Sequence, residues 1–190
     1  MAAGTGLRAR KRAQTRHALH ESAVRLFLER GFDDVTVAQI AEDADVALTT
    51  LFTYYPDGKV ALVFEQDEDR AAALVDAVRK RPAGADPLRA VEAFMASRLP
   101  FEAHDRERKR LLELILSTPQ LRAHVRKKWT DCEDALVTVL ADECREPADA
   151  AVRALARLVL ESPDIAARES TPGEALAMIF ANLRRGWRYD

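Results

Sequence analysis

The chain has 190 residues, with 29 Lys and Arg, 31 Asp and Glu and a formal net charge of −2. With 48% hydrophobic and 32% charged residues, it can bury a substantial core, which argues against an intrinsically disordered protein. No stretch is long and apolar enough for a membrane-spanning helix, and the first residues lack the apolar region of a secretory signal. We therefore expect a cytoplasmic protein with no membrane partner, in which Cys132 and Cys144 are reduced thiols.

Helical spacing of apolar residues runs through most of the chain, and no segment alternates as a strand would. Prolines, glycines and capping residues separate the helical pieces, and Thr36 with Gln39 and Thr171 with Glu174 predict capping boxes. The predicted helices span residues 8–30, 37–43, 48–54, 59–80, 87–103, 106–117, 119–144, 148–161 and 173–187. The sequence thus predicts an all-α fold of about nine helices.

The first predicted helix begins in a cationic stretch. Residues 1–20 contain no Asp or Glu, and their basic residues are Arg8, Arg10, Lys11, Arg12 and Arg16. A basic end on a slightly acidic chain is expected of a protein that contacts a polyanion at one end only.

The next two helices, 37–43 and 48–54, are short and are separated by a turn at residues 44–47. Their apolar residues have the spacing to pack against Leu26 and Phe27 of the first helix; they are Ile40, Ala41, Val46, Leu51 and Tyr55. The residues left facing outward carry no charge and are Leu48, Thr49, Thr50, Thr53 and Tyr54. Threonine hydroxyls can bond phosphates or base edges, and apolar groups can contact a thymine methyl, so this pattern predicts a helix-turn-helix that binds DNA.

Several runs in this region resemble the DNA-binding signature of TetR-family regulators. They are FLERGF at 27–32, TVAQIA at 36–41, ADVA at 44–47 and TLFTYYP at 50–56, followed by Lys59. The resemblance covers about residues 15–65. It implies a three-helix DNA-binding domain at residues 1–58 and a larger helical domain for ligand binding and dimerisation at residues 59–190. It also implies that Thr36 and Lys59 hold phosphates while helix 48–54 enters the major groove.

Three positions depart from the family pattern. Asp45 stands where a turn glycine is usual, and we expect it to take the left-handed conformation at modest cost. Ala47 stands where a serine cap is usual, which removes a side-chain acceptor worth about 1 kcal/mol. The connection at residues 56–59 is one residue longer than usual. The expected DNA contacts come from this region and from the cationic start of the first helix; they are Arg10, Lys11, Arg12, Thr36, Leu48, Thr49, Thr50, Thr53, Tyr54 and Lys59.

For the remainder of the chain the resemblance implies an apolar ligand cavity and a dimer interface on the last two helices. The bulky apolar candidates for the cavity are Phe64, Phe94, Met95, Leu99, Leu112, Leu116 and Trp129. The candidates for the dimer interface are Ala151, Ala154, Leu155, Leu158, Phe180, Leu183 and Trp187. Two such helices pairing with their symmetry mates would form a four-helix contact.

These features predict a sequence-specific transcriptional regulator, a homodimeric repressor released from a pseudopalindromic operator by a small, largely apolar effector. Helix 59–80 would be the lever between the two domains. No enzyme, metal or cofactor is expected, since the GTGLRA run at 4–9 follows no strand and His17, His20 and Glu21 have no further ligand at convincing spacing. A helical module that binds a ligand or a protein without operator DNA is the alternative.

Overall fold

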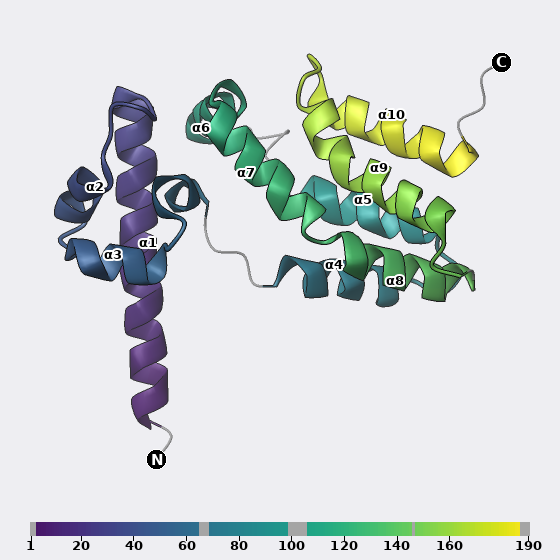
Figure 1. Cartoon of the computed structure of the whole chain (residues 1–190), viewed down its shortest axis with the longest axis horizontal. Coiled ribbons are helices and arrows are strands. Elements are labelled where there is room, and N and C mark those ends of the chain that lie inside the picture. Colours follow the sequence, from purple (N-terminus) through teal and green to yellow (C-terminus); the bar gives the residue numbers. More distant parts are fainter. Residues whose placement is uncertain (1–2, 65–68, 99–105, 146, 187–190) are drawn as a thin grey trace. The chain divides into compact units, whose positions relative to one another are not determined.

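The computed structural model describes residues 3–64, 69–98, 106–145 and 147–186 (Figure 1). Over these residues it contains ten α-helices, one 3-10 helix and no strand, which confirms the all-α prediction. The elements are α1 (Ala3–Arg30), α2 (Val37–Asp43), α3 (Leu48–Tyr54), η1 (Gly58–Val63), α4 (Arg70–Arg79), α5 (Pro87–Arg98), α6 (Arg106–Ser117), α7 (Pro119–Thr130), α8 (Glu133–Cys144), α9 (Ala150–Ala166) and α10 (Pro172–Arg185). No described helix has the length and apolar character needed to cross a membrane.

The helices form two compact units. The N-terminal unit comprises Met1–Asp67 with Glu113–Leu121, and the C-terminal unit comprises Glu68–Leu112 with Arg122–Asp190. The predicted boundary between residues 58 and 59 stays a prediction.

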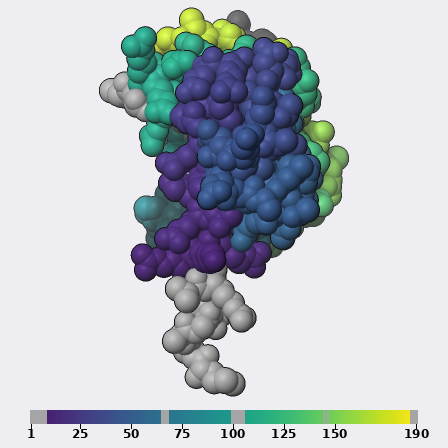
Figure 2. Space-filling model, turned by 90° about the vertical axis from the view of Figure 1, so that its left-hand side faces the viewer, coloured from purple at the N-terminus to yellow at the C-terminus, as the bar shows by residue number. Residues whose placement is uncertain are grey.

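In the N-terminal unit, α2 and η1 pack against the long helix α1, and α3 packs against α2 (Figure 1). Figure 2 shows the purple-to-blue surface of this unit. Gly31, at φ +88°, lets the chain turn directly after α1. The rings of Phe27 and Phe32 then lie 5.1 Å apart across this turn. The buried apolar core of the unit is Leu19, Ala23, Val24, Leu26, Phe27, Phe32, Val35, Ile40, Ala41, Leu51, Tyr55, Leu62, Val63 and Leu121. The predicted burial of Ile40, Ala41, Leu51 and Tyr55 is therefore confirmed, and Val46 is half-buried at the turn.

The predicted helix 59–80 is wrong as a single element. Its first part is the 3-10 helix η1, which ends at Val63 and is followed by Phe64 in an extended conformation (φ −109°, ψ 128°). A separate helix, α4, starts after Asp69, whose carboxylate accepts a hydrogen bond from the backbone N–H of Ala72 at 3.1 Å. A continuous lever helix over residues 59–80 is thus excluded.

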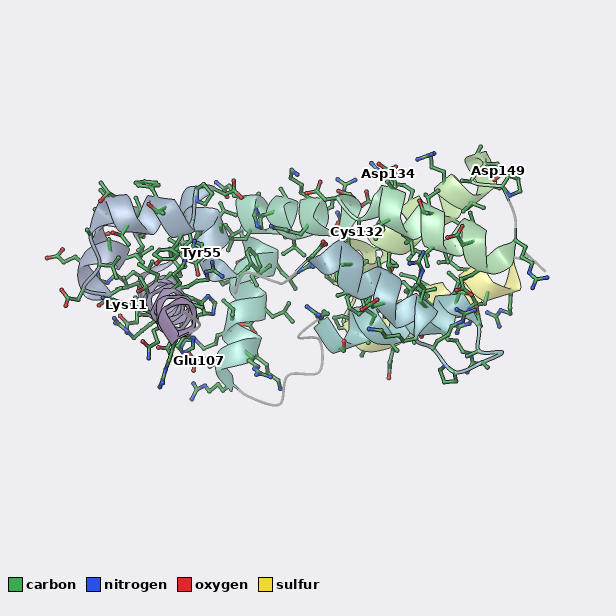
Figure 3. The ribbon with its side chains drawn as sticks, turned by 90° about the horizontal axis from the view of Figure 1, so that it is seen from below. Lys11, Tyr55, Glu107, Cys132, Asp134 and Asp149 are labelled. Atoms are coloured by element: carbon green, nitrogen blue, oxygen red, sulfur yellow. The ribbon has the colours of Figure 1, made fainter. Side chains whose placement is uncertain are left out.

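The predicted helix 119–144 is also two helices, α7 and α8. At the junction the N–H of Cys132 donates to the carbonyl of Trp129 at 3.0 Å, so the helical ladder tightens and stops. Glu133 and Asp134 then occupy the first turn of α8, where negative charge favours a helix N-terminus. Figure 3 labels Cys132 and Asp134 on either side of this new start.

The C-terminal unit is built from packed pairs of helices, among them α4 with α8, α8 with α9 and α9 with α10 (Figure 1). Asp149, labelled in Figure 3, caps α9 by accepting from the N–H groups of Ala151 and Val152 at 2.9 and 3.0 Å. The capping box predicted at Thr171 is wrong, because its side chain makes no cap bond and Pro172 begins α10 instead. The core of this unit includes Leu74, Val78, Val91, Met95, Trp129, Leu136, Leu140, Val159, Leu160, Leu176 and Phe180.

Candidate nucleic-acid interface

A capping box starts α2, and a left-handed turn connects α2 to α3. Thr36 Oγ1 accepts from the backbone N–H of Gln39 at 3.2 Å, and the Gln39 side chain accepts from the N–H of Thr36 at 2.8 Å. Asp45 lies at φ +53°, as predicted, and the next N–H, that of Val46, bonds the carbonyl of Ala41 at 2.9 Å. Both expectations for this region are confirmed, so α3 starts in a defined direction although Ala47 gives it no side-chain cap.

An uncharged, partly apolar surface covers the outer side of α3. Leu48 is 41% exposed and Phe52 is 45% exposed. Thr49 and Thr53 are exposed beside them, and the Thr53 hydroxyl donates to the carbonyl of Thr49 at 2.9 Å. We call these four residues the α3 face.

Two predicted contacts lie outside this face, and one member was missed. Thr50 and Tyr54 are half-buried. Phe52 was not among the predicted DNA contacts, although it lies one helical turn from Leu48 and therefore on the same side of the helix. That spacing was the signal that could have found it.

The cationic end of α1 belongs to the same unit as the α3 face. Arg10, Lys11 and Arg12 are exposed on it, and Figure 3 labels Lys11 there. The guanidinium carbons of Arg12 and Arg16 lie 5.8 and 6.0 Å from the ring centroid of Tyr54, a cation–π arrangement that links α1 to α3.

Tyr55, directly after α3, also connects α3 to α1. The hydroxyl of Tyr55 donates to the carbonyl of Arg16 at 3.2 Å, and its ring is fully buried.

Lys59 has a different geometry from a typical phosphate contact. Its ammonium group donates to the carbonyl oxygens of Phe32 and Val35 at 2.5 and 3.0 Å, and it lies 4.2 Å from the ring centroid of Phe32. These contacts hold the loop between α1 and α2 against η1. The phosphate role of Lys59 stays a prediction, and the geometry favours a structural role.

A salt bridge between Arg25 and Asp43 connects α1 to α2. The Arg25 guanidinium donates to both carboxylate oxygens of Asp43. These hydrogen bonds, with a smaller contribution from Ser22, hold the pKa of Asp43 below its ordinary value. On the opposite side of α1, His20 Nδ1 lies 3.0 Å from the carbonyl oxygen of Leu62 in η1.

The predicted ligand contacts are divided between the two units. Phe94, Met95 and Trp129 belong to the C-terminal unit, where the Phe94 and Trp129 rings meet edge to face at 6.3 Å. Phe64 and Leu116 belong to the N-terminal unit. Leu112 is half-buried and Leu99 lies outside the described residues, so the ligand assignment stays a prediction.

The α9 and α10 helices expose large apolar side chains: Leu158 at 50%, Ile165 at 48% and Met178 at 62%. Of these, only Leu158 was among the predicted dimer contacts. Phe180 is fully buried in the core of its own unit, so it is not available to a partner and that prediction is wrong.

The other predicted dimer contacts differ in exposure. Ala151 and Ala154 are exposed, and Leu155 and Leu183 are half-buried. Trp187 lies outside the described residues.

Two family models match the chain, and together they cover most of its length. Residues 19–65 match the bacterial regulatory proteins of the tetR family, and residues 85–181 match the MftR C-terminal domain. The HTH-type transcriptional regulator TcmR of Streptomyces glaucescens is 31% identical over 197 residues, covering 93% of this chain and 84% of that protein. The putative mycofactocin biosynthesis transcriptional regulator MftR of Mycobacterium tuberculosis is 30% identical over 135 residues, covering 70% and 67%.

Solved structures show the same fold at lower identity. Thermus thermophilus FadR, a transcriptional repressor in complex with lauroyl-CoA, aligns with a TM-score of 0.58 and 23% identity over 92% of this chain and 96% of that one. NalD of Pseudomonas aeruginosa, the secondary repressor of a multidrug efflux pump, aligns with a TM-score of 0.56 and 22% identity over 90% and 96%.

Proposed function

Because the chain belongs to the TetR family of DNA-binding transcriptional regulators, we propose that it is a homodimeric repressor that leaves a pseudopalindromic operator when a small, largely apolar ligand binds. The observation that carries this proposal is the uncharged α3 face within the same unit as a cationic helix end. The cations attract the phosphate backbone of DNA, and the uncharged surface of α3 is then suited to contact the base edges in a groove.

The contacts divide by chemistry into two groups. Arg10, Lys11 and Arg12 are proposed to neutralise phosphates. Thr36 is proposed to face a phosphate at the start of α2, for which its hydroxyl has to turn away from Gln39 Oε1, its acceptor at 3.1 Å. The α3 face is proposed to enter the major groove, because a helix of this kind fits its width and its first residues meet the base edges.

The exposed apolar residues of α9 and α10 support the dimer. A pseudopalindromic operator requires two α3 faces at a spacing of about 34–36 Å, which a single chain does not supply. Large apolar side chains exposed at about half of their surface or more favour a contact with a partner, and a twofold pairing of these helices would bury them.

Footprinting on the DNA that flanks the gene for this chain tests the operator. We expect protection of two half-sites one helical turn apart, with an affinity that falls linearly with the logarithm of salt concentration. Absence of preference for any duplex at low ionic strength would contradict operator binding and favour a helical module that acts without DNA.

Met178→Glu tests the dimer. At a twofold interface the introduced carboxylate would be buried close to the same carboxylate of the partner, which is unfavourable. We therefore expect monomers in light scattering. We also expect that neither half-site is protected at concentrations where the wild type binds. Ala72→Glu places the same charge on the exposed side of α4 and is expected to stay dimeric. A dimeric Met178→Glu variant would show that the interface lies elsewhere.

Candidate apolar ligands that bind the purified dimer test release. We expect a ligand at saturation to lower operator affinity, because it can shift the protein only by binding one state more tightly than the other. A tight ligand that leaves operator affinity unchanged would contradict this part of the proposal.

A further inference from the structure

We propose that Leu48 and Phe52 form a methyl-reading pair that recognises the C5 methyl group of thymine in the major groove. This inference rests on the proposed operator binding through α3 and goes beyond it, because it names the chemical group on the DNA that the protein distinguishes. The predicted preference is for thymine at the positions under this pair.

The first observation is the exposure of the pair. Leu48 and Phe52 are the exposed large apolar side chains in the described part of the N-terminal unit. They are one turn apart on a helix whose other side is buried through Leu51 and whose next residue, Tyr55, is fully buried. The pair therefore forms one apolar ridge along the outer side of α3.

The second observation concerns the side chains of α3 that could hydrogen-bond to bases. The helix has the sequence LTTLFTY and contains no Arg, Lys, Asn, Gln, Asp or Glu. The paired contacts that identify guanine, adenine and cytosine use those side chains, so α3 itself cannot make them. Thr53 already donates its hydroxyl hydrogen to the carbonyl of Thr49 at 2.9 Å, which leaves its methyl group and acceptor lone pairs for the groove.

Threonine hydroxyls can bond more than one kind of base, so apolar contact to a methyl group is the remaining chemistry on α3 that singles out one base. Of the four bases, only thymine presents a methyl group in the major groove. An exposed leucine and an exposed phenylalanine bury apolar area against that methyl without a donor or acceptor. The α3 face is thus matched to a 5-methylpyrimidine.

Duplex DNA fits this ridge better than a protein partner does. Two side chains flanked by threonines offer far less than the roughly 1,200 Å² that a stable protein interface buries. The cations Arg10, Lys11 and Arg12 are exposed on the same unit, and their charge complements a phosphate backbone.

The test compares operator duplexes that differ only in methyl groups. Each thymine of the footprinted site is replaced by uracil, which keeps the base pair and removes the methyl. Binding of the full-length protein is measured by fluorescence anisotropy at fixed salt. We expect a loss of about fourfold in affinity for each contacted methyl, and about fifteenfold for the symmetric pair in the two half-sites. Thymines outside the α3 contacts serve as the internal control and should show no effect.

Variants then assign the effect to the pair. Leu48→Ala and Phe52→Ala should bind the thymine operator more weakly and should lose their sensitivity to uracil at one position each, whereas Ala72→Glu, on the exposed side of α4, should keep it. Both truncated side chains are exposed, so the fold does not depend on them. The slope of affinity against salt should be the same for thymine and uracil duplexes, because no phosphate contact changes.

The outcomes separate this inference from the proposed function. If a fully uracil-substituted operator binds as tightly as the thymine operator while random DNA binds more weakly, operator binding stands and the methyl-reading pair is overturned. If operator and random duplexes bind alike, both are overturned. A uracil effect that persists in both alanine variants assigns the methyl to other residues and also overturns the inference.

Discussion

Replacing Lys59 by methionine removes a cation that holds the loop between α1 and α2. Its ammonium group donates to the carbonyl oxygens of Phe32 and Val35 at 2.5 and 3.0 Å and lies over the Phe32 ring at 4.2 Å. A hydrogen bond to a charged group contributes about 1.5–3 kcal/mol. Because Lys59 is half-buried and the two carbonyls can regain water, we expect the variant to lose about 2–4 kcal/mol of its free energy of unfolding.

Two measurements distinguish this structural role from a phosphate contact. Urea unfolding followed by circular dichroism gives the stability, and operator titrations at several salt concentrations give the number of phosphates neutralised. For Lys59→Met we expect lower stability and an unchanged salt slope, measured below the unfolding transition. Lys11→Met is the matched control, since Lys11 is exposed on α1. It should keep its stability within about 0.5 kcal/mol and reduce the slope by about 0.9 for each protomer, or about 1.8 for the dimer.

The reverse result for Lys59→Met would refute this reasoning. Unchanged stability with a slope reduced by about 1.8 for the dimer would mean that the ammonium group of each protomer leaves the two carbonyls and binds a phosphate. The family-based prediction for Lys59 would then hold, and the loop would have to be held by its apolar contacts alone.

Three further variants test other contacts of the N-terminal unit. Tyr54→Leu removes the ring under two guanidinium groups and should lower the salt slope of operator binding by up to about 1.8 for each protomer, or about 3.6 for the dimer, whereas Tyr54→Phe should keep it; equal effects of the two would point to the hydroxyl instead. Ala47→Ser should raise the free energy of unfolding by about 1 kcal/mol in urea titrations, because it supplies the missing cap of α3. Asp43→Asn tests the bond to Arg25. Because the pKa of Asp43 is held below its ordinary value of 3.8, its contribution is complete above that pH and disappears as the pH falls through the lowered pKa. Thermal unfolding of wild type and variant should therefore differ at neutral pH and converge in acid, and a constant difference would assign the effect to packing.

The elements that the sequence predicted most closely are those specified by neighbouring residues. The bounds of α2 and α3 agree with the predicted 37–43 and 48–54, because a capping box and a turn residue act within a few positions of each other. Asp45 likewise takes the left-handed conformation that its own side chain tolerates.

The features that were missed depend on contacts between distant residues. The helical spacing of the apolar residues Trp129, Cys132 and Leu136 continues across the junction of α7 and α8. For this reason the spacing alone did not predict that the helix is interrupted there. On α10, Phe180 faces the core and Met178 faces outward. Both are apolar, and only the packing of the neighbouring helices decides which of them is buried.

The candidate site was predicted in part for the same reason. The sequence indicated an uncharged outer surface on α3, and the structure adds Phe52 to it. Lys59 matches the family pattern in the sequence, but its contacts with two backbone carbonyls come from a loop more than twenty residues earlier. Such a contact has no local signature.

The α1 helix runs without a break from Ala3 to Arg30, 28 residues in all, or about 42 Å at the usual rise per residue. Its cationic end is therefore a continuation of the same rod whose later turns form the hydrophobic core of the N-terminal unit. A flexible basic tail loses backbone entropy of about 1–2 kcal/mol for every residue that becomes ordered on DNA. Here the backbone is already helical, so docking freezes mainly the arginine and lysine side chains, and association carries little of the heat-capacity change of coupled folding.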